Sequence, residues 1–222
     1  PRHADQLGSS LCSVINDMYT GRPAPGALEI PIDIQYAPAP PIAISLPEND
    51  LFAPGEDQLL AVTKRLQASR KTVVVAGGGV ISSGASDALL TLAEKLDLPV
   101  LTTVDGRGCI PETHRLCVGN YYNSAGIYNA IQDAEVTLAI GTKFAVGVDG
   151  QFAAQKPPGD LIQIDIDGNM VGRTHRASIG VIADAKLVLE GIISQIDNVD
   201  ANDSQFNDLV WQARDGVRTA MR

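Results

Sequence analysis

The amino-acid sequence predicts an α/β domain in which helices cover both faces of a parallel sheet. Short apolar runs, typical of strands buried on both faces, alternate with amphipathic helical segments between Glu56 and Ile196. Three consecutive glycines, Gly77 to Gly79, directly follow the first apolar run, as in a turn from a strand into a helix. A chain of 222 residues is long enough for one such domain with flanking segments.

The segment before this alternation is predicted to contain one amphipathic helix and one short strand. The helix spans His3 to Thr20, and the strand spans Ala27 to Ile30 after a turn rich in glycine and proline. The apolar face of the helix consists of Leu7, Leu11, Val14, Ile15 and Met18. Because one helix and one strand cannot bury such a face, we expect another part of the protein to cover it.

A proline-rich stretch follows this segment. Residues 31 to 54 contain six of the 13 prolines of the chain. Proline favours extended backbone and cannot donate to a strand ladder, so this density predicts an extended linker between domains.

Beyond the linker, helices and strands are expected in regular succession. The expected helices span Glu56 to Ala68, Ala85 to Leu96, Ile127 to Ala134, and Ala185 to Ile196. The expected strands span Thr72 to Ala76, Val100 to Thr103, Val136 to Ile140, Leu161 to Ile166, and Ile179 to Ile182. The alternation indicates a Rossmann-like, doubly wound parallel sheet of about six strands. The tail is polar at first and then helical around Phe206, Leu209, Val210 and Val217.

Composition excludes several classes of protein. The net charge of −9 and the scattered lysines and arginines argue against a nucleic-acid partner. No apolar run is long enough for a membrane span. Three cysteines without a CxxC pair, and no visible signal peptide, favour the cytoplasm. Cys109, His114 and Cys117 are close in sequence but lack a fourth metal ligand, so no metal site is predicted.

Polar and glycine residues that follow the strands are the candidate cofactor-binding residues. In open α/β folds, ligands bind at the carboxyl edge of the sheet, where backbone amides and carboxylates reach phosphate and ribose groups. The candidates from this argument are Gly77, Gly78, Gly79, Thr102, Thr103, Gly141, Thr142, Asp165 and Asp167. The alternative for each is structural, because glycines turn a chain and threonines or aspartates cap helices. The dinucleotide pattern G-x-G-x-x-G is not met, since Ser82 stands where the third glycine belongs.

Catalytic motifs are not found in the sequence. G-x-S-x-G and the Walker motif are absent, and the three histidines have no obvious nucleophile beside them. We therefore predict no catalytic residue in this chain. The residues alone indicate a parallel α/β domain with a nucleotide cleft, which we expect to be separated here from an adjacent domain of a larger protein.

The motifs along the chain resemble those of the thiamine-diphosphate-dependent acetolactate synthase and 2-oxo acid decarboxylase family. Residues 21 to 33 resemble its GRPGPV-x-x-x-IP-x-D, and residues 73 to 84, VVVAGGGVISSG, resemble the opening of its central domain. Residues 98 to 114 resemble PV-x-TT followed by GKG-x-x-P-x-x-H. Residues 134 to 142, 164 to 167 and 183 to 185 resemble AD-x-x-LAIGT, HIDID and GDA.

This resemblance implies a domain organisation. Residues 1–33 would end the pyrimidine-binding domain, 34–54 would form the linker, and 55–197 would form the central domain. Residues 198–222 would lead toward an absent diphosphate-binding domain. The longer protein to which this chain would belong, called the parent below, would bind thiamine diphosphate and Mg²⁺ between its other two domains. It would form a homodimer or homotetramer. The four Asp-Gly pairs of this chain are never preceded by glycine, unlike the family's G-D-G motif, so the fragment alone is expected to be inactive.

The resemblance adds Gly119, Lys143 and Asp184 to the candidate cofactor-binding residues. In the family the central domain holds FAD, holds ADP or is empty. Residues 141 to 147 lack the arginines and aspartates of the flavin pattern G-x-RFDDR, and residues 118 to 122 lack the histidine of the LGMHG-like loop. An adenine nucleotide or an empty cleft is therefore favoured over FAD.

Two alternatives to this interpretation stay open. One is a free-standing nucleotide-binding module of a nicotinamide- or flavin-dependent oxidoreductase. The other is a catalytically silent interaction domain. The uncovered apolar face of the N-terminal helix argues against both, because an autonomous module does not need it.

Overall fold

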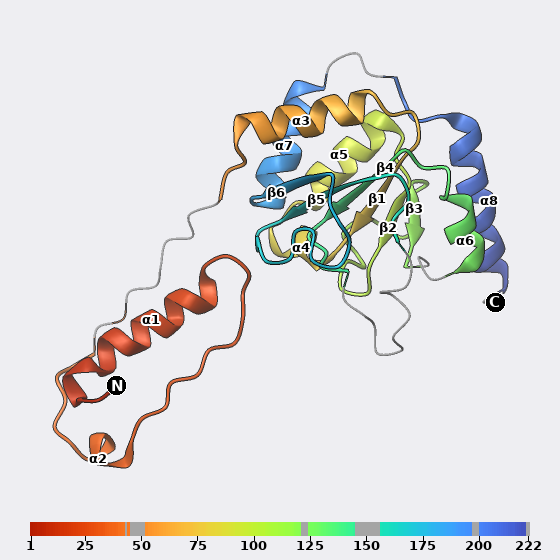
Figure 1. Cartoon of the computed structure of the whole chain (residues 1–222). Coiled ribbons are helices and arrows are strands. Elements are labelled where there is room, and N and C mark those ends of the chain that lie inside the picture. The colour runs from red at the N-terminus through yellow and green to blue at the C-terminus, as the bar shows by residue number, and fades with distance from the viewer. Residues whose placement is uncertain (43, 45–51, 121–123, 145–155, 197–199, 221–222) are drawn as a thin grey trace. The chain divides into compact units, whose positions relative to one another are not determined.

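The computed structural model describes residues 1–42, 44, 52–120, 124–144, 156–196 and 200–220. The chain divides into two compact units, Pro1–Leu51 and Phe52–Arg222. The larger unit contains a six-stranded sheet, and its helices are labelled in Figure 1. In the part of the chain that the structure describes, no helix has both the length and the apolar character needed to cross a membrane.

The sheet of the larger unit is entirely parallel and has the strand order β3-β2-β1-β4-β5-β6. The strands are β1 (Thr72–Ala76), β2 (Val100–Thr102), β3 (Cys117–Gly119), β4 (Val136–Ile140), β5 (Asp160–Asp165) and β6 (Ile179–Ile182). The order reverses between β1 and β4, which are paired from Thr72 with Val136 to Ala76 with Ile140. This is the strand order of a Rossmann-like sheet, so the predicted fold class is confirmed.

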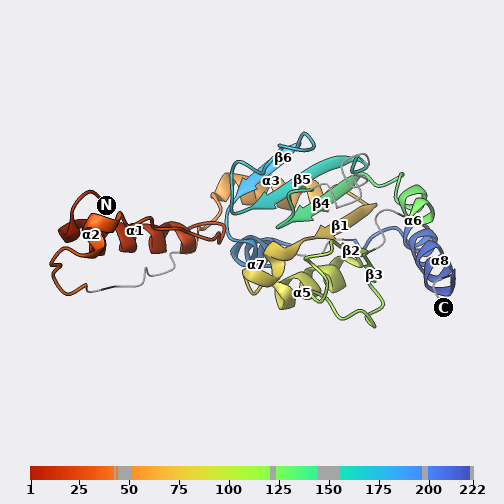
Figure 2. The ribbon, with the colours of Figure 1, turned by 90° about the horizontal axis from the view of Figure 1, so that it is seen from below.

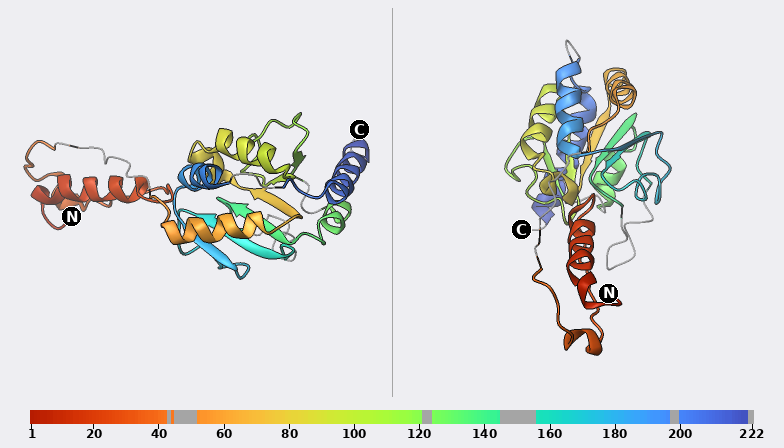
Figure 3. Two further views of the ribbon diagram at one scale, coloured as in Figure 1. Left: turned by 90° about the horizontal axis from the view of Figure 1, so that it is seen from above. Right: turned by 90° about the vertical axis from the view of Figure 1, so that its left-hand side faces the viewer.

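Helices cover both faces of the sheet. One face packs against α3 (Glu56–Gln67), α5 (Ser86–Leu96) and α7 (Ala185–Gln195), and the other packs against α6 (Ala125–Ala130) and α8 (Ser204–Ala220) (Figure 2). Alternate residues of one strand point to opposite faces, so Val74 belongs to one apolar cluster while Val73 and Val75 belong to the other. Helices α6 and α8 lie side by side (Figure 3).

The last helix is part of this packed unit. Phe206 and Val210 of α8 are buried in the cluster formed with α6 and the sheet. Arg218 donates from Nη2 to the carbonyl oxygens of Glu112 (3.1 Å) and Cys117 (3.3 Å), and Arg214 donates from Nη1 to that of Arg115 (2.8 Å). These contacts hold helix α8 beside β3, the strand at one edge of the sheet.

Several element predictions differ from the structure in detail. The strand β3 was not predicted, because three residues with a single β-branched side chain give no readable pattern. Helix α6 is shorter and begins two residues earlier than predicted. The glycine run is not only a turn, since Gly77 precedes a short helix, α4 (Gly78–Ser82).

The smaller unit contains η1 (Ala4–Gln6), α1 (Leu7–Tyr19) and α2 (Ile32–Gln35). The predicted N-terminal helix is thus present with a 3₁₀ turn at its start. The predicted strand Ala27 to Ile30 is wrong, because these residues have no regular structure and no strand pairs with them among the described residues. No residue of α1 is buried, although Gly26 packs against Val14 and Met18. Part of the predicted linker, residues 43 and 45–51, lies outside the described residues.

Candidate functional site

The structure places all twelve candidate cofactor-binding residues at or just after the carboxyl ends of the strands. Because the six strands are parallel, these ends share one edge of the sheet. The residues are Gly77, Gly78 and Gly79 after β1, Thr102 and Thr103 at β2, Gly119 at β3, Gly141, Thr142 and Lys143 after β4, Asp165 and Asp167 at β5, and Asp184 after β6. Their binding role stays a prediction, and their contacts decide what each can offer a ligand.

The glycine turn after β1 packs directly against the turn after β4. The Gly77 amide donates to the Ile140 carbonyl oxygen (2.8 Å), and the Gly79 amide donates to that of Gly141 (3.1 Å). A Cβ atom on Gly77 would lie 2.2 Å from the Gly141 oxygen, and Gly141 has a φ of +58°. Two of the three glycine amides therefore stabilise the fold at the point where the strand order reverses, and are not available to a phosphate.

The turn after β2 is held in a similar way. Thr103 donates its amide to the Ala76 oxygen (2.9 Å), and its hydroxyl accepts from the Gly106 amide (3.1 Å). A Cβ atom on Gly106 would lie 2.2 Å from the Ala76 oxygen, so only glycine allows this approach. Thr102 is buried within the sheet. Both threonines thus have a structural role in this conformation.

A buried glutamine of β5 fixes the segment after β4. Gln163 is 1% exposed, and its Nε2 atom donates to the carbonyl oxygens of Thr142 (3.1 Å) and Met170 (3.1 Å). Its Oε1 atom accepts from the Gly172 amide (2.8 Å). Lys143 has an exposed side chain, and its carbonyl oxygen accepts from Thr174 (3.0 Å). Gln163 was not predicted as a site residue, since a polar residue within an apolar strand was the only signal.

The three aspartates at the edge also accept backbone hydrogen bonds. Asp165 Oδ1 accepts from the Asp167 amide (3.0 Å), and Asp167 Oδ1 accepts from the Asn169 amide (2.9 Å). Asp184 Oδ1 accepts from the amides of Lys186 (2.9 Å) and Leu187 (3.2 Å), which makes it the N-cap of α7. Each carboxylate therefore supports a turn or a helix start, as the structural alternative expected.

One residue at this edge has unused capacity for hydrogen bonding. Asn120, directly after β3, has a buried Oδ1 atom with no hydrogen-bond partner among the described residues. Buried polar atoms are normally paired, so an unpaired one points to a missing donor. The sequence could have singled it out only if β3 had been predicted, because Asn120 then follows a strand end.

Large apolar side chains are exposed at the same edge. Ile81 of α4, Val104 after β2 and Ile182 at the end of β6 have exposed fractions of 46%, 62% and 42%. Such side chains can contact an apolar ligand ring or another protein surface.

The cysteines and histidines form no candidate catalytic or metal centre in the described part of the chain. No group of three or more potential metal ligands is found there. Burial raises the pKa of the Cys109 thiol to about 11, and it also raises that of Cys117, so both are protonated at neutral pH. His114 contacts Glu94 through Nε2 at 3.2 Å on the surface.

The parallel sheet and its strand order define a Rossmann-like α/β domain. Residues 59–192 match the family described as thiamine pyrophosphate enzyme, central domain. This match covers more than half of the chain, and the chain belongs to that family.

Acetolactate synthases are among the relatives of this chain. The chain is 35% identical over 196 residues to a probable acetolactate synthase large subunit from Methanocaldococcus jannaschii, a match that covers 84% of this chain and 33% of the relative. It is 31% identical over 193 residues to the acetolactate synthase isozyme 3 large subunit of Escherichia coli (82% and 33% covered). The chain thus spans about a third of the length of these relatives.

A solved structure shares the fold. Benzoylformate decarboxylase from Polynucleobacter necessarius superimposes with a TM-score of 0.73 at 23% identity, covering 91% of this chain and 38% of that one. This similarity shows the common architecture of the domain.

Proposed function

We propose that the parent of this chain is an acetolactate synthase-like enzyme that decarboxylates a 2-oxo acid and transfers the resulting carbanion equivalent to an acceptor or a proton. Thiamine diphosphate, when bound in such an enzyme, supplies the electron sink for this carbanion. The proposal is supported by the match of residues 59–192 to the central domain of thiamine pyrophosphate enzymes.

Within that parent, this chain acts as a scaffold. At the carboxyl edge, amides, hydroxyls and carboxylates of the candidate residues are already used to hold the turns after β1, β2, β4, β5 and β6. The described residues include no cluster of carboxylates for Mg²⁺, and the Asp-Gly pairs lack a preceding glycine. These residues do not fit thiamine diphosphate, so no step of its chemistry is assigned to them, and the fragment alone is expected to be inactive.

An adenine nucleotide is the ligand that the carboxyl edge suits best. The unpaired Asn120 Oδ1 atom can accept from an amino group or a ribose hydroxyl, and Ile81, Val104 and Ile182 offer apolar surface to a ring. Lys143 is exposed and can contact a phosphate. FAD is less favoured, because the flavin-type arginines and aspartates are missing; residues 145–147 of that pattern lie outside the described residues.

The remaining expectations concern the whole protein. We place the parent in the cytoplasm, which suits three cysteines that form no disulfide. We expect its other two domains to be the partners of this one, and the parent to form a homodimer or homotetramer. The half-buried apolar face of α1 supports a partner that covers it.

Thermal melts with ADP, FAD, NAD, or thiamine diphosphate and Mg²⁺ test the nucleotide assignment. ADP at about 100 times its Kd would stabilise the fold by about 2.7 kcal/mol and raise Tm by roughly 5–10 °C. Asn120→Ala should remove this shift, whereas Asn129→Ala, an exposed amide on α6, should keep it. A Mg²⁺-dependent shift with thiamine diphosphate would contradict the scaffold role, and no shift with ADP would leave the domain without a nucleotide.

A further inference from the structure

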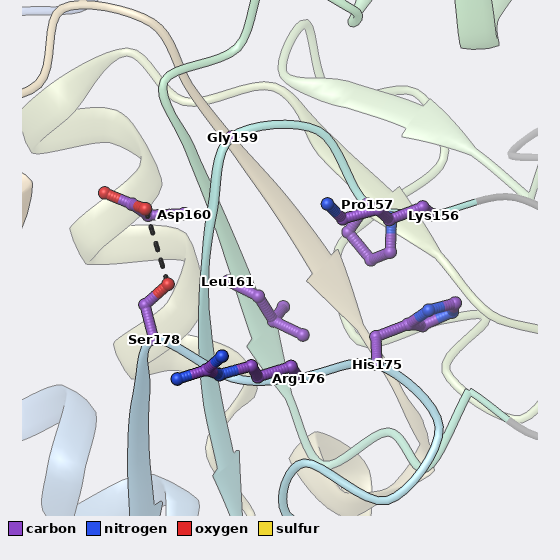
Figure 4. Close-up of a pocket in the computed structure, with 8 residues that line it drawn as sticks. All are labelled: Lys156, Pro157, Gly159, Asp160, Leu161, His175, Arg176 and Ser178. Carbon is purple, nitrogen blue, oxygen red and sulfur yellow. Dashed lines mark hydrogen bonds between the residues drawn. The ribbon is translucent and has the colours of Figure 1, made fainter.

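A pocket lies away from the carboxyl edge. It has a volume of about 220 Å³ and is lined by Lys156, Asp160, Leu161, His175, Arg176 and Ser178, among others (Figure 4). Asp160 and Leu161 begin β5, and Ser178 directly precedes β6. Because these strands are parallel, the pocket lies toward their amino ends, opposite the candidate nucleotide site.

The lining of this pocket carries a local positive charge in a chain whose net charge is −9. Lys156 and Arg176 form no ion pair among the described residues, so their charges are not neutralised by a carboxylate there. Asp160 is the acidic residue of the lining. Its Oδ2 atom pairs with Arg65 Nε at 2.8 Å, and its Oδ1 atom accepts from Ser178 Oγ at 3.3 Å. Arg65, which is not part of the lining, thus neutralises the charge of Asp160, and this leaves Lys156 and Arg176 as excess cations in the pocket.

His175 adds an unpaired polar atom. Its buried Nε2 atom has no hydrogen-bond partner in the described part of the chain, and its ring packs edge-on against Phe144 with a centroid distance of 5.2 Å. Burial lowers the pKa of His175, and the charge of Lys156 lowers it further, so the lysine lies close enough to act on the imidazole. Figure 4 shows Lys156 and His175 on one side of Leu161, and Arg176 and Asp160 on the other.

We propose that this pocket binds a small anion of the phosphate class. Arginine and lysine are the side chains that bind phosphoryl oxygens, and a compensated carboxylate does not oppose them. The pocket is smaller than the roughly 300–1,000 Å³ of sites for drug-sized ligands and cofactors, so it suits orthophosphate or pyrophosphate and excludes a whole nucleotide. This site is distinct from the nucleotide proposed at the carboxyl edge and does not depend on it.

Titration calorimetry of the 222-residue chain with pyrophosphate at low ionic strength tests the site. We expect saturable binding that weakens with added salt, and Lys156→Gln and Arg176→Gln should each lower the affinity about tenfold. Arg173→Gln is the matched control, because Arg173 is an exposed cation of the same loop and is not part of the lining. It should change the affinity less than about twofold. Unchanged circular dichroism and Tm show that the variants fold.

Two results would overturn the proposal. One is that pyrophosphate binding does not saturate. The other is that Arg173→Gln lowers the affinity as much as the two lining variants do, which would indicate a diffuse effect of surface charge. The phosphates of a nucleotide are the other source of this chemistry, so ADP is titrated in parallel. Asn120→Ala should abolish ADP binding and leave pyrophosphate binding intact, whereas Arg176→Gln should weaken pyrophosphate binding about tenfold and leave ADP binding intact. If Arg176→Gln weakened the binding of both ligands, the pocket would be part of a nucleotide site and the inference of a separate site would fail.

Discussion

Asn202 is expected to be a main determinant of the stability of the larger unit, and Asn202→Ala tests this. The side chain lies beside the first residue of the central strand β1. Its Oδ1 atom accepts from the Thr72 amide (2.8 Å), and its Nδ2 atom donates to the Thr72 carbonyl oxygen (2.9 Å) and to Asn207 Oδ1 (3.0 Å). Thr72 and Asn207 are each 2% exposed, so solvent does not reach them readily.

The expected cost of Asn202→Ala follows from these three hydrogen bonds. A buried donor or acceptor that loses its partner costs about 1–3 kcal/mol. Asn202 itself is 8% exposed, and the space left by the shorter side chain can admit water that partly replaces the lost partners. We therefore expect a loss of about 2–4 kcal/mol in the free energy of unfolding, which is a large part of the 5–15 kcal/mol typical of a domain.

Urea denaturation followed by the fluorescence of Trp211 measures this loss. Trp211 is the one tryptophan of the chain and packs against both apolar clusters of the larger unit, so its signal reports that unit specifically. At a slope of about 2 kcal/mol/M the midpoint should fall by about 1–2 M. Asn169→Ala removes an amide that donates to Asp167 (3.1 Å) on the surface, and it should cost less than about 0.5 kcal/mol. If the two variants lost the same stability, the argument for Asn202 would be refuted.

Two further predictions concern the glycine turn and the thiols. Gly77→Ala should prevent folding or destabilise the larger unit by several kcal/mol, because its Cβ atom would lie 2.2 Å from the Gly141 oxygen. Gly216→Ala in α8 is the control, because a Cβ atom there would have no neighbour within 4 Å. In the same urea titration it should be neutral or stabilise the unit by about 1 kcal/mol. With a thiol reagent at pH 8, half-buried Cys12 should react first. Cys109 and Cys117 should react only on unfolding, because both are buried and the pKa of Cys109 is about 11. Rapid reaction of all three thiols would contradict the burial of Cys109 and Cys117.

The sequence predicted the sheet well because its central strands are continuous apolar runs. Thr72 to Ala76 and Val136 to Ile140 are buried on both faces, and such a run is readable without tertiary information. β3 could not be predicted, since its three residues are held at the sheet edge by pairing with β2 and by a hydrogen bond from Arg218 of α8, which lies about 100 positions away in the chain. The strand expected from Ala27 to Ile30 failed for the related reason that a strand needs a partner.

The sequence could predict where the candidate site lies, but not which of its residues are free to bind a ligand. Glycines, threonines and aspartates after strands correctly marked one edge of the sheet, because parallel strands bring their carboxyl ends together. Whether Asp184 contacts a ligand or caps α7 depends on the hydrogen bonds to Lys186 and Leu187, which sequence alone does not determine. Asn120 was missed as a separate candidate because its importance depends on an unpaired atom, which only the structure reveals.

The contact between the turns after β1 and β4 indicates how a Rossmann-like domain can act as a scaffold. At the point between β1 and β4, where an open α/β sheet usually binds its ligand, the backbones of Gly79 and Gly141 are in contact, and a Cβ atom on Gly79 would lie 2.6 Å from Gly141 Cα. A pyrophosphate cannot enter between these two turns without separating them. A nucleotide at this edge must therefore lie over the turns, toward Asn120 and the exposed Val104, rather than in the crevice. Binding there adds to a fold that is already complete, which is consistent with a domain whose main contribution to its parent is structural.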